Sequence, residues 1–525
     1  MEHLVQVLAY ENTMVVTRLF VIIFLMQIDS SHGAGGYSKG KEFMLTFLYN
    51  HQDVQSKEEH NFIFVTSEQD GWVALEQYVP GESHAHIQNY SLTADVAQTI
   101  VLSDHSEMSP ASGVEKKGIF VFSNVDVVVS AINEDLQGTS EDAFLVLPVK
   151  SLSRDYLVPT VWSNPLMGVV ALLPNTHVEV RVKTNCDISY KLDVLSHGST
   201  INVTLDHADV FQLYAVYQTG SNCDMGGTEV IADKPVAVFS GSSCAELGKG
   251  CDHLMQQVIP VELWGRRFIV PDIFDVDPWE VRILSTQSSY VSVVEHERDG
   301  TTHTVNREIE RGVPVDYQIP DGTLVEIFAN HDIMVTQYST ASAPFIIPIP
   351  SVDQYAWNTT ITTMDNPTSH NFISFVNVVV KTQSIHTFIL DGATISNSSW
   401  QAVRDLGYSI ATVPVTQGTH KLSCEHPFFA TVYGYDGTGS YGYLAGYHFN
   451  KFPSENLSVL DTVVRPTQGP VTTQAPCEDS PGVNCPVLAA SLRICKTPST
   501  AKRYCIKYCG LCPVSCTEPG CGFGK

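Results

Sequence analysis

The chain has 525 residues, with 30 Lys and Arg against 56 Asp and Glu, and a formal net charge of −26. A chain of this length exceeds a single hydrophobic core and predicts roughly three to five domains. The acidic excess repels nucleic-acid phosphates and anionic lipid headgroups, so neither is an expected partner. Because 43% of the residues are apolar and only 16% are charged, the composition favours a folded β-rich extracellular protein over a disordered acidic one.

The N-terminal region contains one apolar run, LFVIIFLMQI at residues 19–28, between Arg18 and a group of small residues. Ten residues are too few to span a bilayer, and the order basic, apolar, small is that of a secretory signal. We interpret residues 1–34 as a signal peptide, with Met14 as the alternative start. The mature chain is then predicted to be secreted, without a membrane span.

Short runs of alternating apolar and polar residues fill the region from about residue 40 to residue 449, as in HVEVRVKT at 177–184. This pattern is typical of antiparallel sandwiches and barrels. One nine-residue unit, VIADKPVAV at 230–238, has counterparts at 121–129, 327–335 and 422–430. Each copy is interpreted as a strand end, a small residue, a polar turn and a second apolar strand. The segments from 147, 259 and 347 repeat as well and are interpreted as joints.

The copies are spaced by roughly a hundred residues, which is the size of one immunoglobulin-like sandwich. We therefore predict an all-β fold of tandem antiparallel β-sandwich-like modules at 37–149, 150–262, 263–350 and 351–452. The alternative is a β-propeller-like closed ring in which each unit supplies two blades. Residues 453–476 are interpreted as a Pro/Thr linker, 477–512 as a small disulfide-rich domain and 513–525 as a cysteine-containing tail.

Thirteen cysteines are present, and eight of them lie in residues 477–525, a density that indicates an oxidising compartment. Cys424 occupies the repeat position held elsewhere by Ser123, Ala232 and Ala329, so we interpret it as a small buried residue with a free thiol. The expected disulfides outside the small domain are Cys244–Cys251, Cys186–Cys223 and a local pair, Cys516–Cys521. Five sequons predict N-glycosylation at Asn89, Asn202, Asn358, Asn397 and Asn456.

Three patterns are candidates for sites of chemistry. Residues 36–40 fit the G-x-S-x-G hydrolase pattern, but a nucleophile elbow needs a preceding strand and a following helix, so we interpret them as a flexible mature N-terminus. Cys244, Cys251 and His253 lack the spacing of a structural zinc site. Asp252 and His253 beside Trp264 form either half of a polar site or a pair that hydrogen-bonds a turn. We predict no catalytic, cofactor-binding or metal-binding residues and no cofactor.

A Tyr/Gly-rich run, VYGYDGTGSYGYLAGYHF at 432–449, is read in two ways. It forms either an exposed aromatic surface or a closing hairpin with tyrosines in its core.

The central part of the chain resembles the N-terminal domain of the IgGFc-binding protein family over roughly residues 40–450. The resemblance implies a secreted adhesion protein of mucus or cell surfaces without catalysis. The sequence departs from the family pattern at Gln256 and Ile259, where Glu and Pro are expected, and it lacks the von Willebrand D-type repeats. The segments that carry the resemblance are KPVAVFSG (234–241), CA (244–245), CDHLM (251–255), WG (264–265), LLPNT (172–176), LDG (390–392) and YGY (433–435).

The C-terminal block is similar to the sea-anemone-toxin-like ShKT domain, on the basis of Cys477-x-Asp479 and the run from Cys505 to Cys512. The family's connectivity implies the disulfides Cys477–Cys512, Cys485–Cys505 and Cys495–Cys509. The Lys-Tyr pair that toxins of this family use to block potassium channels has no match at the required position, so a protein-interaction or spacer module is the expected role.

These observations predict a secreted, non-enzymatic glycoprotein that binds extracellular proteins or glycans at a mucosal or matrix surface. Two alternatives stay open. One is a toxin-like effector whose ShKT domain acts on ion channels, and the other is a secreted enzyme whose site is dispersed over several modules.

Overall fold

The structure, a computed structural model, describes residues 36–449 except for 52–58, 80–83, 103–104, 136–139, 216–221, 248–249, 342, 365–371, 404–405 and 438. These described residues form 34 β-strands and five 3-10 helices, and they contain no α-helix. The prediction of an all-β fold is confirmed. The features predicted in residues 1–34 and 453–525, including Asn456 and the ShKT domain, lie outside the described residues.

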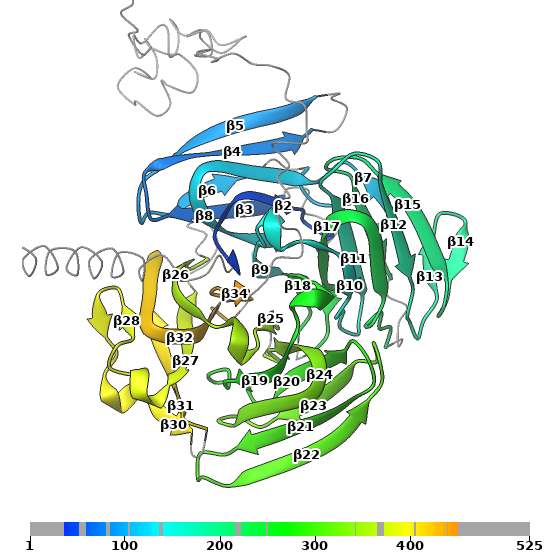
Figure 1. Cartoon of the computed structure of the whole chain (residues 1–525). Coiled ribbons are helices and arrows are strands. Elements are labelled where there is room, and N and C mark those ends of the chain that lie inside the picture. The colour runs from blue at the N-terminus through cyan, green and yellow to red at the C-terminus, as the bar shows by residue number, and fades with distance from the viewer. Residues whose placement is uncertain are drawn as a thin grey trace, which may run out of the picture. The chain divides into compact units, whose positions relative to one another are not determined.

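Four groups of strands, called modules 1 to 4, follow one another along the chain (Figure 1). Module 1 contains β2 (Gly40–Leu45), β3 (Glu59–Ser67), β4 (Gly71–Tyr78), β5 (Ala85–Leu92), β6 (Gln98–Val101), β8 (Ile119–Asp135) and β9 (Glu141–Leu145). Module 2 contains β10 (Ser153–Leu157), β11 (Pro165–Ala171), β12 (Thr176–Arg181), β15 (Thr200–Leu205), β16 (Val210–Tyr214), β17 (Glu229–Ala245) and β18 (Asp252–Gln257), and it carries the hairpin β13 (Ile188–Tyr190) and β14 (Asp193–Leu195).

Module 3 contains β19 (Gly265–Val270), β20 (Trp279–Ser285), β21 (Ser289–His296), β22 (Thr302–Ile309), β23 (Val315–Ile319), β24 (Leu324–Tyr338) and β25 (Ile346–Ile349). Module 4 contains β26 (Ala356–Thr362), β27 (Ile373–Lys381), η4 (Thr382–Ser384), β28 (Ile389–Leu390), β29 (Ala393–Thr394), η5 (Asn397–Ser399), β30 (Gln401–Val403), β31 (Tyr408–Val415), β32 (Thr419–Tyr435) and β33 (Ser440–Leu444). One short strand, β7 (Gly113–Glu115), precedes β8 in the chain but pairs with β16 of module 2.

Each module is organised around one long strand: β8, β17, β24 or β32, which are 15 to 17 residues long. The prediction of a polar turn inside the repeat is wrong, because the polar residues of the repeat lie within the continuous long strand. Where the first strand of each module pairs with the long strand, the register shifts and four residues of the long strand have no partner in it. In module 1, Gly40 of β2 pairs with Val127 and Glu42 pairs with Phe122. The same step omits residues 232–235, 329–332 and 424–427 in the other modules.

The polar residues of this step have backbone partners, which explains their place in an apolar strand. The side chains of Asn124, Asp233 and Asn330 each accept a hydrogen bond of 2.8 Å from a backbone N–H of the neighbouring strand β4, β12 or β21. A register step leaves ladder groups without their usual partners, and these side-chain oxygens accept the backbone N–H groups beside the step. The repeat therefore encodes a bulge with its own hydrogen-bond acceptor.

The long strand belongs to two layers of its module. In module 1 the first half of β8 pairs with β2 and β4, while its second half pairs with β3 and β9. β4 extends to β5 and β3 extends to β6. In module 2 one hydrophobic cluster draws on both layers, with Val180 and Val230 from one and Val169, Phe211 and Val238 from the other. This arrangement agrees with the predicted sandwich-like modules.

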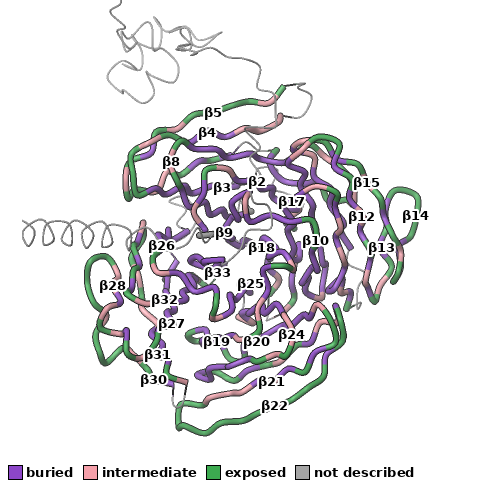
Figure 2. The backbone as a smooth tube through the Cα atoms, viewed as in Figure 1, coloured by how far each residue is buried: buried purple, intermediate pink, exposed green. Residues whose placement is uncertain are grey.

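The modules surround a common centre, where β9, β18, β25 and β33 lie beside one another (Figures 1 and 2). Three 3-10 helices, η1 (Val149–Ser151), η2 (Val261–Leu263) and η3 (Val352–Gln354), connect consecutive modules at the predicted joints. We call the four central strands the hub. Each module is built on one long strand and is sandwich-like, as predicted, whereas the alternative prediction gave each unit two propeller blades.

The ring is closed by the first and last described strands, β1 (Gly36–Tyr37) and β34 (His448–Phe449), which pair antiparallel. The backbone N–H of Ser38 donates to the carbonyl of Tyr447 at 3.1 Å, and the Ser38 side chain is buried. The interpretation of residues 36–40 as a flexible N-terminus is therefore wrong, since these residues complete the ring.

The close contact between modules 2 and 3 predicts that alanine substitutions at two glycines destabilise the protein to different extents. Gly227 and Gly198 both have a φ of 86°, but a Cβ on Gly227 would lie 1.7 Å from the Gly312 carbonyl oxygen, whereas Gly198 faces open space. We expect Gly198→Ala to cost about 1 kcal/mol through left-handed strain alone. Gly227→Ala should cost about 3 kcal/mol or more, because the seam must open.

Thermal unfolding of the two variants measures this difference, with Gly198→Ala as the matched control. Equal melting temperatures for the two variants would contradict a close contact between the modules at Gly227.

Candidate functional site

The most unusual polar residues of the fold lie in the hub, on two strands that each begin with charged or polar residues. β9 begins Glu141-Asp142, and β18 begins Asp252-His253, the pair singled out in the sequence. All four residues are fully buried. Buried ionisable groups need partners or a shifted pKa, so their surroundings decide what they can do.

Asp142 joins all four hub strands through its carboxylate. It accepts backbone N–H groups of Ala143 at 2.9 Å, Met255 at 3.2 Å and Gly442 at 3.3 Å, and a fourth from Ile346. These donors come from β9, β18, β33 and β25. Burial raises the pKa of Asp142 well above its usual range, and the four amide hydrogen bonds oppose that rise.

Asp252 links β18 to β9. Its Oδ1 accepts the backbone N–H groups of Glu141 and His253, both at 2.8 Å, while its Oδ2 has no hydrogen-bond partner among the described residues. Burial, followed by the negative charge of Glu141, raises the pKa of Asp252 well above its usual range. Burial at the hub therefore favours the protonated form of Asp252 relative to an exposed aspartate.

His253 is a neutral core histidine. Burial lowers its pKa to about 3, and a smaller effect of the Ser242 backbone acts in the opposite direction. Neither ring nitrogen has a hydrogen-bond partner within the part of the chain that the structure describes. Such a group can neither exchange protons with solvent at neutral pH nor reach a ligand, so the structural reading of this pair is favoured over half of a polar site.

Two glutamines complete the hub. The Nε2 of Gln256 donates to the carbonyls of Ala143 at 2.7 Å and Gly442 at 3.1 Å, and the Oε1 of Gln257 accepts the N–H of Leu147 at 2.6 Å. A glutamate at position 256, which the family pattern favours, could donate in this way only when protonated. The departure at Gln256 thus suits the position in this chain.

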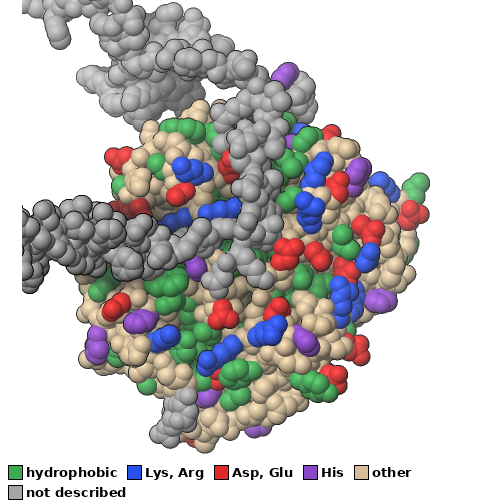
Figure 3. Space-filling model, viewed as in Figure 1, with side chains coloured by type: hydrophobic (Ala, Val, Ile, Leu, Met, Phe, Trp, Pro, Cys, Tyr) green, Lys and Arg blue, Asp and Glu red, His purple; other side chains and the backbone are tan. Residues whose placement is uncertain are grey.

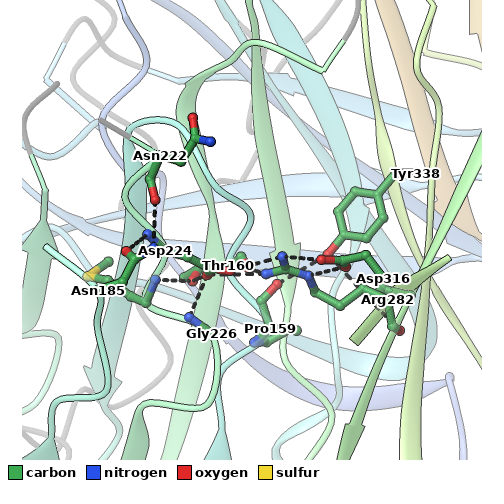
Figure 4. A network of polar contacts seen from close by, with 11 residues as sticks. Pro159, Thr160, Asn185, Asn222, Asp224, Gly226, Arg282, Asp316 and Tyr338 are labelled. Atoms are coloured by element: carbon green, nitrogen blue, oxygen red, sulfur yellow. Dashed lines mark hydrogen bonds and ion pairs between the residues drawn. The ribbon is translucent and has the colours of Figure 1, made fainter. Parts of the chain in front are cut away.

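A second buried polar network lies in the seam between modules 2 and 3, around Arg282 of β20 (Figure 4). The guanidinium contacts Asp316 at 2.7 Å through Nε and Asp224 at 2.9 Å through Nη2, and it also donates to the Thr160 carbonyl. The Trp162 ring lies 5.2 Å from the guanidinium carbon. Burial disfavours the charged form of Arg282, but the two carboxylates and Tyr338 outweigh it and raise its pKa.

The two disulfides within the described residues support these networks. Cys186 and Cys223 are joined, which places Asn185 beside Asp224, and the Asn185 side chain accepts the Asp224 backbone N–H at 2.8 Å. The bond therefore holds the loop that presents Asp224 to Arg282. Cys244 and Cys251 are also joined, at the end of the β17–β18 hairpin that carries Asp252 into the hub. Cys424 is a buried free thiol.

These bonds also settle the zinc hypothesis, since disulfide sulfurs are not available as thiolate ligands. Within the described ranges, no group of three or more His, Cys, Asp or Glu side chains is placed to hold a metal ion.

The structure also shows whether the other residues singled out in the sequence are buried or exposed. Trp264 is buried, and its Nε1 donates to the Ile259 carbonyl at 2.9 Å. In the Tyr/Gly-rich run, four tyrosines are buried and Tyr435 is partly exposed, which favours the closing hairpin over an aromatic surface; the four are Tyr433, Tyr441, Tyr443 and Tyr447. Of the predicted glycosylation sites, four lie on exposed positions: Asn89, Asn202, Asn358 and Asn397.

Three surface pockets are large enough to hold part of a ligand. Two of them, of about 210 and 220 Å³, share Lys41 and Asp126 in their linings; the first extends from module 1 to Thr360 of module 4, and the second extends from module 1 to η1. We call them the closure groove. A third pocket of about 520 Å³ lies on module 2, between His177, Asn202 and Asp233. On the face shown in Figure 3, acidic and basic side chains are interspersed.

The closure groove contains three lysines in an otherwise acidic protein. Lys39 pairs with Glu68 at 2.5 Å and donates to the Asn358 side chain at 3.0 Å. Lys41 is exposed and has no hydrogen bond or ion pair among the described residues. Burial lowers the pKa of Lys150, and Asp126 opposes this shift. The groove therefore offers basic side chains to an added anionic group.

Taken together, the fold and these sites define a disulfide-containing, all-β multi-module protein whose interior polar groups hold the ring and whose accessible polar groups line surface grooves. Residues 142–434 match the profile of the IgGFc binding protein family, so the chain belongs to that family. Among the described residues, no helix has the length and apolarity needed to cross a bilayer.

A curated relative is the human (Homo sapiens) IgGFc-binding protein, 24% identical over 389 residues. The match covers 71% of this chain and 7% of the relative, so this chain corresponds to a small part of that protein. Among solved structures, a mutant of the major pilin from Streptococcus pyogenes aligns over 78% of this chain and 98% of the pilin, at 8% identity and a TM-score of 0.14. A tetra-tandem repeat from a large adhesion protein aligns over 79% and 100%, at 13% identity and a TM-score of 0.10. Scores this low carry no structural argument.

The lowered pKa of His253 predicts that part of the folding stability of the ring is lost at acidic pH. The unfolded histidine titrates near its ordinary pKa of about 6.5, whereas the folded one binds a proton only near pH 3. Between these values the unfolded state binds more protons, so stability falls as the pH falls, by about 1.4 kcal/mol per pH unit. We expect His253→Leu to remove this component of the slope.

Denaturant unfolding at several pH values between 7 and 4 measures the slope, and wild type and His253→Leu should differ by about one proton. His197→Leu in an exposed turn is the matched control and should keep the wild-type slope. Parallel curves for wild type and His253→Leu would show that the buried imidazole is not coupled to folding.

The buried network around Arg282 predicts that losing this side chain lowers the free energy of unfolding. Arg282→Met leaves Asp224 and Asp316 without their cation, and removing one partner of a buried ion pair costs roughly 3–5 kcal/mol. The matched control is Arg298→Met, since Arg298 is largely exposed and lies 3.4 Å from Asp272. An exposed pair contributes about 0–1 kcal/mol.

Chemical denaturation of the two variants provides the comparison. A loss for Arg282→Met no larger than that for Arg298→Met would mean that the seam does not depend on this network.

Proposed function

We propose that this chain is a secreted, non-enzymatic binding protein that acts at an extracellular surface and takes proteins or glycans as ligands. The observation that carries the proposal is the family match over residues 142–434. The relative's name describes a protein that binds the Fc part of immunoglobulin G, and Fc binding is one candidate activity for this chain. The two disulfides support an oxidising, extracellular setting.

The closure groove is the binding site that the geometry favours. Lys41 is exposed and lines the groove, and burial lowers the pKa of the partly buried Lys150, so a nearby negative charge would stabilise the charged forms of both lysines. Ser67, Gln69 and Asn124 line the same groove and offer the donors and acceptors that saccharide hydroxyls use. The ligand chemistry that fits is a carboxylate- or sulfate-bearing glycan carried by an extracellular protein.

The electrostatic field of the whole protein affects how an acidic ligand approaches the groove. A net charge of −26 repels acidic ligands at a distance, so binding at the groove depends on short-range contacts with the lysines. Raising the salt concentration screens both effects, and the long-range repulsion is screened more strongly than the contacts.

A binding assay on the full chain, secreted from animal cells, tests the proposal. Surfaces would carry immunoglobulin Fc, a sialylated mucin, a sulfated mucin, or the same mucins with these groups removed. We expect binding to an acidic mucin, and Lys41→Glu should weaken it by about tenfold, which corresponds to about 1.4 kcal/mol.

The matched control is Arg154→Glu. Arg154 is exposed and occupies the same bulged position of module 2, opposite the same four-residue step. It should leave mucin binding unchanged. Equal losses in both variants would point to a general charge effect, and binding to Fc alone, unaffected by Lys41→Glu, would place the ligand site elsewhere. Failure to bind any of these surfaces would contradict the proposed ligand class.

A further inference from the structure

The outer edges of the four modules are equivalent strands that differ in how they are protected. β5, β15, β22 and β29 each pair with a single neighbour, on one side only. The opposite side of an edge strand presents unpaired N–H and C=O groups, which can template another strand. Natural proteins therefore shorten, charge or cover such edges.

Three of these edges are blunted. β5 and β15 carry the exposed sequon asparagines Asn89 and Asn202 near their middles, and β29 has only two residues. A glycan on a strand residue is a bulky, hydrated group that hinders the approach of a second sheet. The sequon argument rests on the secretion proposed above, because sequons are used only in the secretory pathway.

β22 has no such protection. It is eight residues long, with the sequence THTVNREI, and contains neither a sequon nor a proline. Six of its first seven residues are exposed (Figure 2). The edge strands of the other layer are shorter: β6, β7, β23 and β30 have 4, 3, 5 and 3 residues. Within the described residues, β22 is thus the longest edge without a cap.

The residues of β22 favour a second copy of the same strand as the partner. In an antiparallel pairing centred on the strand, Thr302 lies opposite Ile309, and His303 lies opposite Glu308 at both ends of the ladder. Arg307 then faces Thr304, and no two like charges are opposed. Directly opposed residues are the pairs that stabilise or destabilise a sheet. A two-fold axis makes every contact occur twice.

We propose that β22 is a self-association edge: two copies of this chain pair their β22 strands antiparallel and join two modules 3 into a continuous sheet. An eight-residue ladder is smaller than a standard stable interface, so the dimer is weak and reversible. It therefore forms where the protein is concentrated or tethered. On such a surface, two rings would present two closure grooves, and paired sites gain avidity.

Glu308→Thr tests the edge directly. It turns Asn306, at an exposed position of β22, into the acceptor of a new N-x-T sequon and so adds the kind of cap that the sequence places on β5 and β15. Sedimentation velocity of the secreted full chain over a wide concentration range is the readout. We expect wild type to shift from monomer to dimer, and glycosylated Glu308→Thr to stay monomeric at every concentration.

Glu308→Gln is the matched control, since it removes the same charge without creating a sequon. It should weaken dimerisation by no more than about tenfold, through the loss of the two His303–Glu308 contacts. Enzymatic trimming of the Glu308→Thr glycan should restore association. A second arm removes the natural caps: Asn89→Gln with Asn202→Gln should yield assemblies larger than dimers, because two further edges become available.

Two outcomes would contradict the proposed β22 dimer. A wild-type chain that stays monomeric at all concentrations would overturn the proposal and leave β22 as an edge for a foreign strand or for none. Dimerisation unaffected by the glycan at Asn306 would place the interface elsewhere. Mucin or Fc binding is measured separately, so a failure here is distinguishable from a failure of the proposed function.

Discussion

The ring depends on one buried carboxylate. Asp142 accepts backbone N–H groups from all four hub strands, including Met255, Gly442 and Ile346, which lie in three other modules. The central strands have no shared ladder that could align them, so a side-chain acceptor must bind their amides. Hydrogen bonds to a charged group are each worth more than neutral ones, about 1.5–3 kcal/mol. The four bonds oppose the effect of burial on this carboxylate, which nevertheless raises its pKa.

The interior chemistry therefore serves assembly, and this changes how the polar residues of the core are understood. Asp252, His253 and Gln256 lie on one short strand, and each contributes to the contact of β18 with its neighbours or adjusts to burial there. A disulfide at the end of the β17–β18 hairpin fixes that strand. The groups that remain available to a ligand are at the surface, where Lys41 and its neighbours line the closure groove.

Much of the architecture follows from the repeat in the sequence, because strand alternation and spacing are local properties. The four-residue polar step is wrongly predicted as a turn for a physical reason. Asn124 and Asp233 resemble turn residues, yet each accepts an N–H from an adjacent strand, and that partner lies 52 or 56 residues away. A local window contains no information about such a donor.

The same limit applies to the candidate site. Asp252 and His253 stand out in the sequence as a pair, but their burial cannot be deduced from neighbours in sequence. Sequence reasoning misses Asp142 and Arg282 altogether, although each is a charged residue within a fully buried strand, Asp142 near the start of β9 and Arg282 in the middle of β20. That pattern is a usable signal. The partners that explain it are distant in sequence, up to 300 residues for Gly442.

The pairing of β1 with β34 gives the ring a defined response to pulling. Gly36 lies opposite Phe449, so the first and last described residues lie at the same end of this short ladder. Tension between the two ends would peel the ladder one bond at a time, whereas shearing would load all bonds together. A force applied at these two ends would therefore act on the β1–β34 pairing directly.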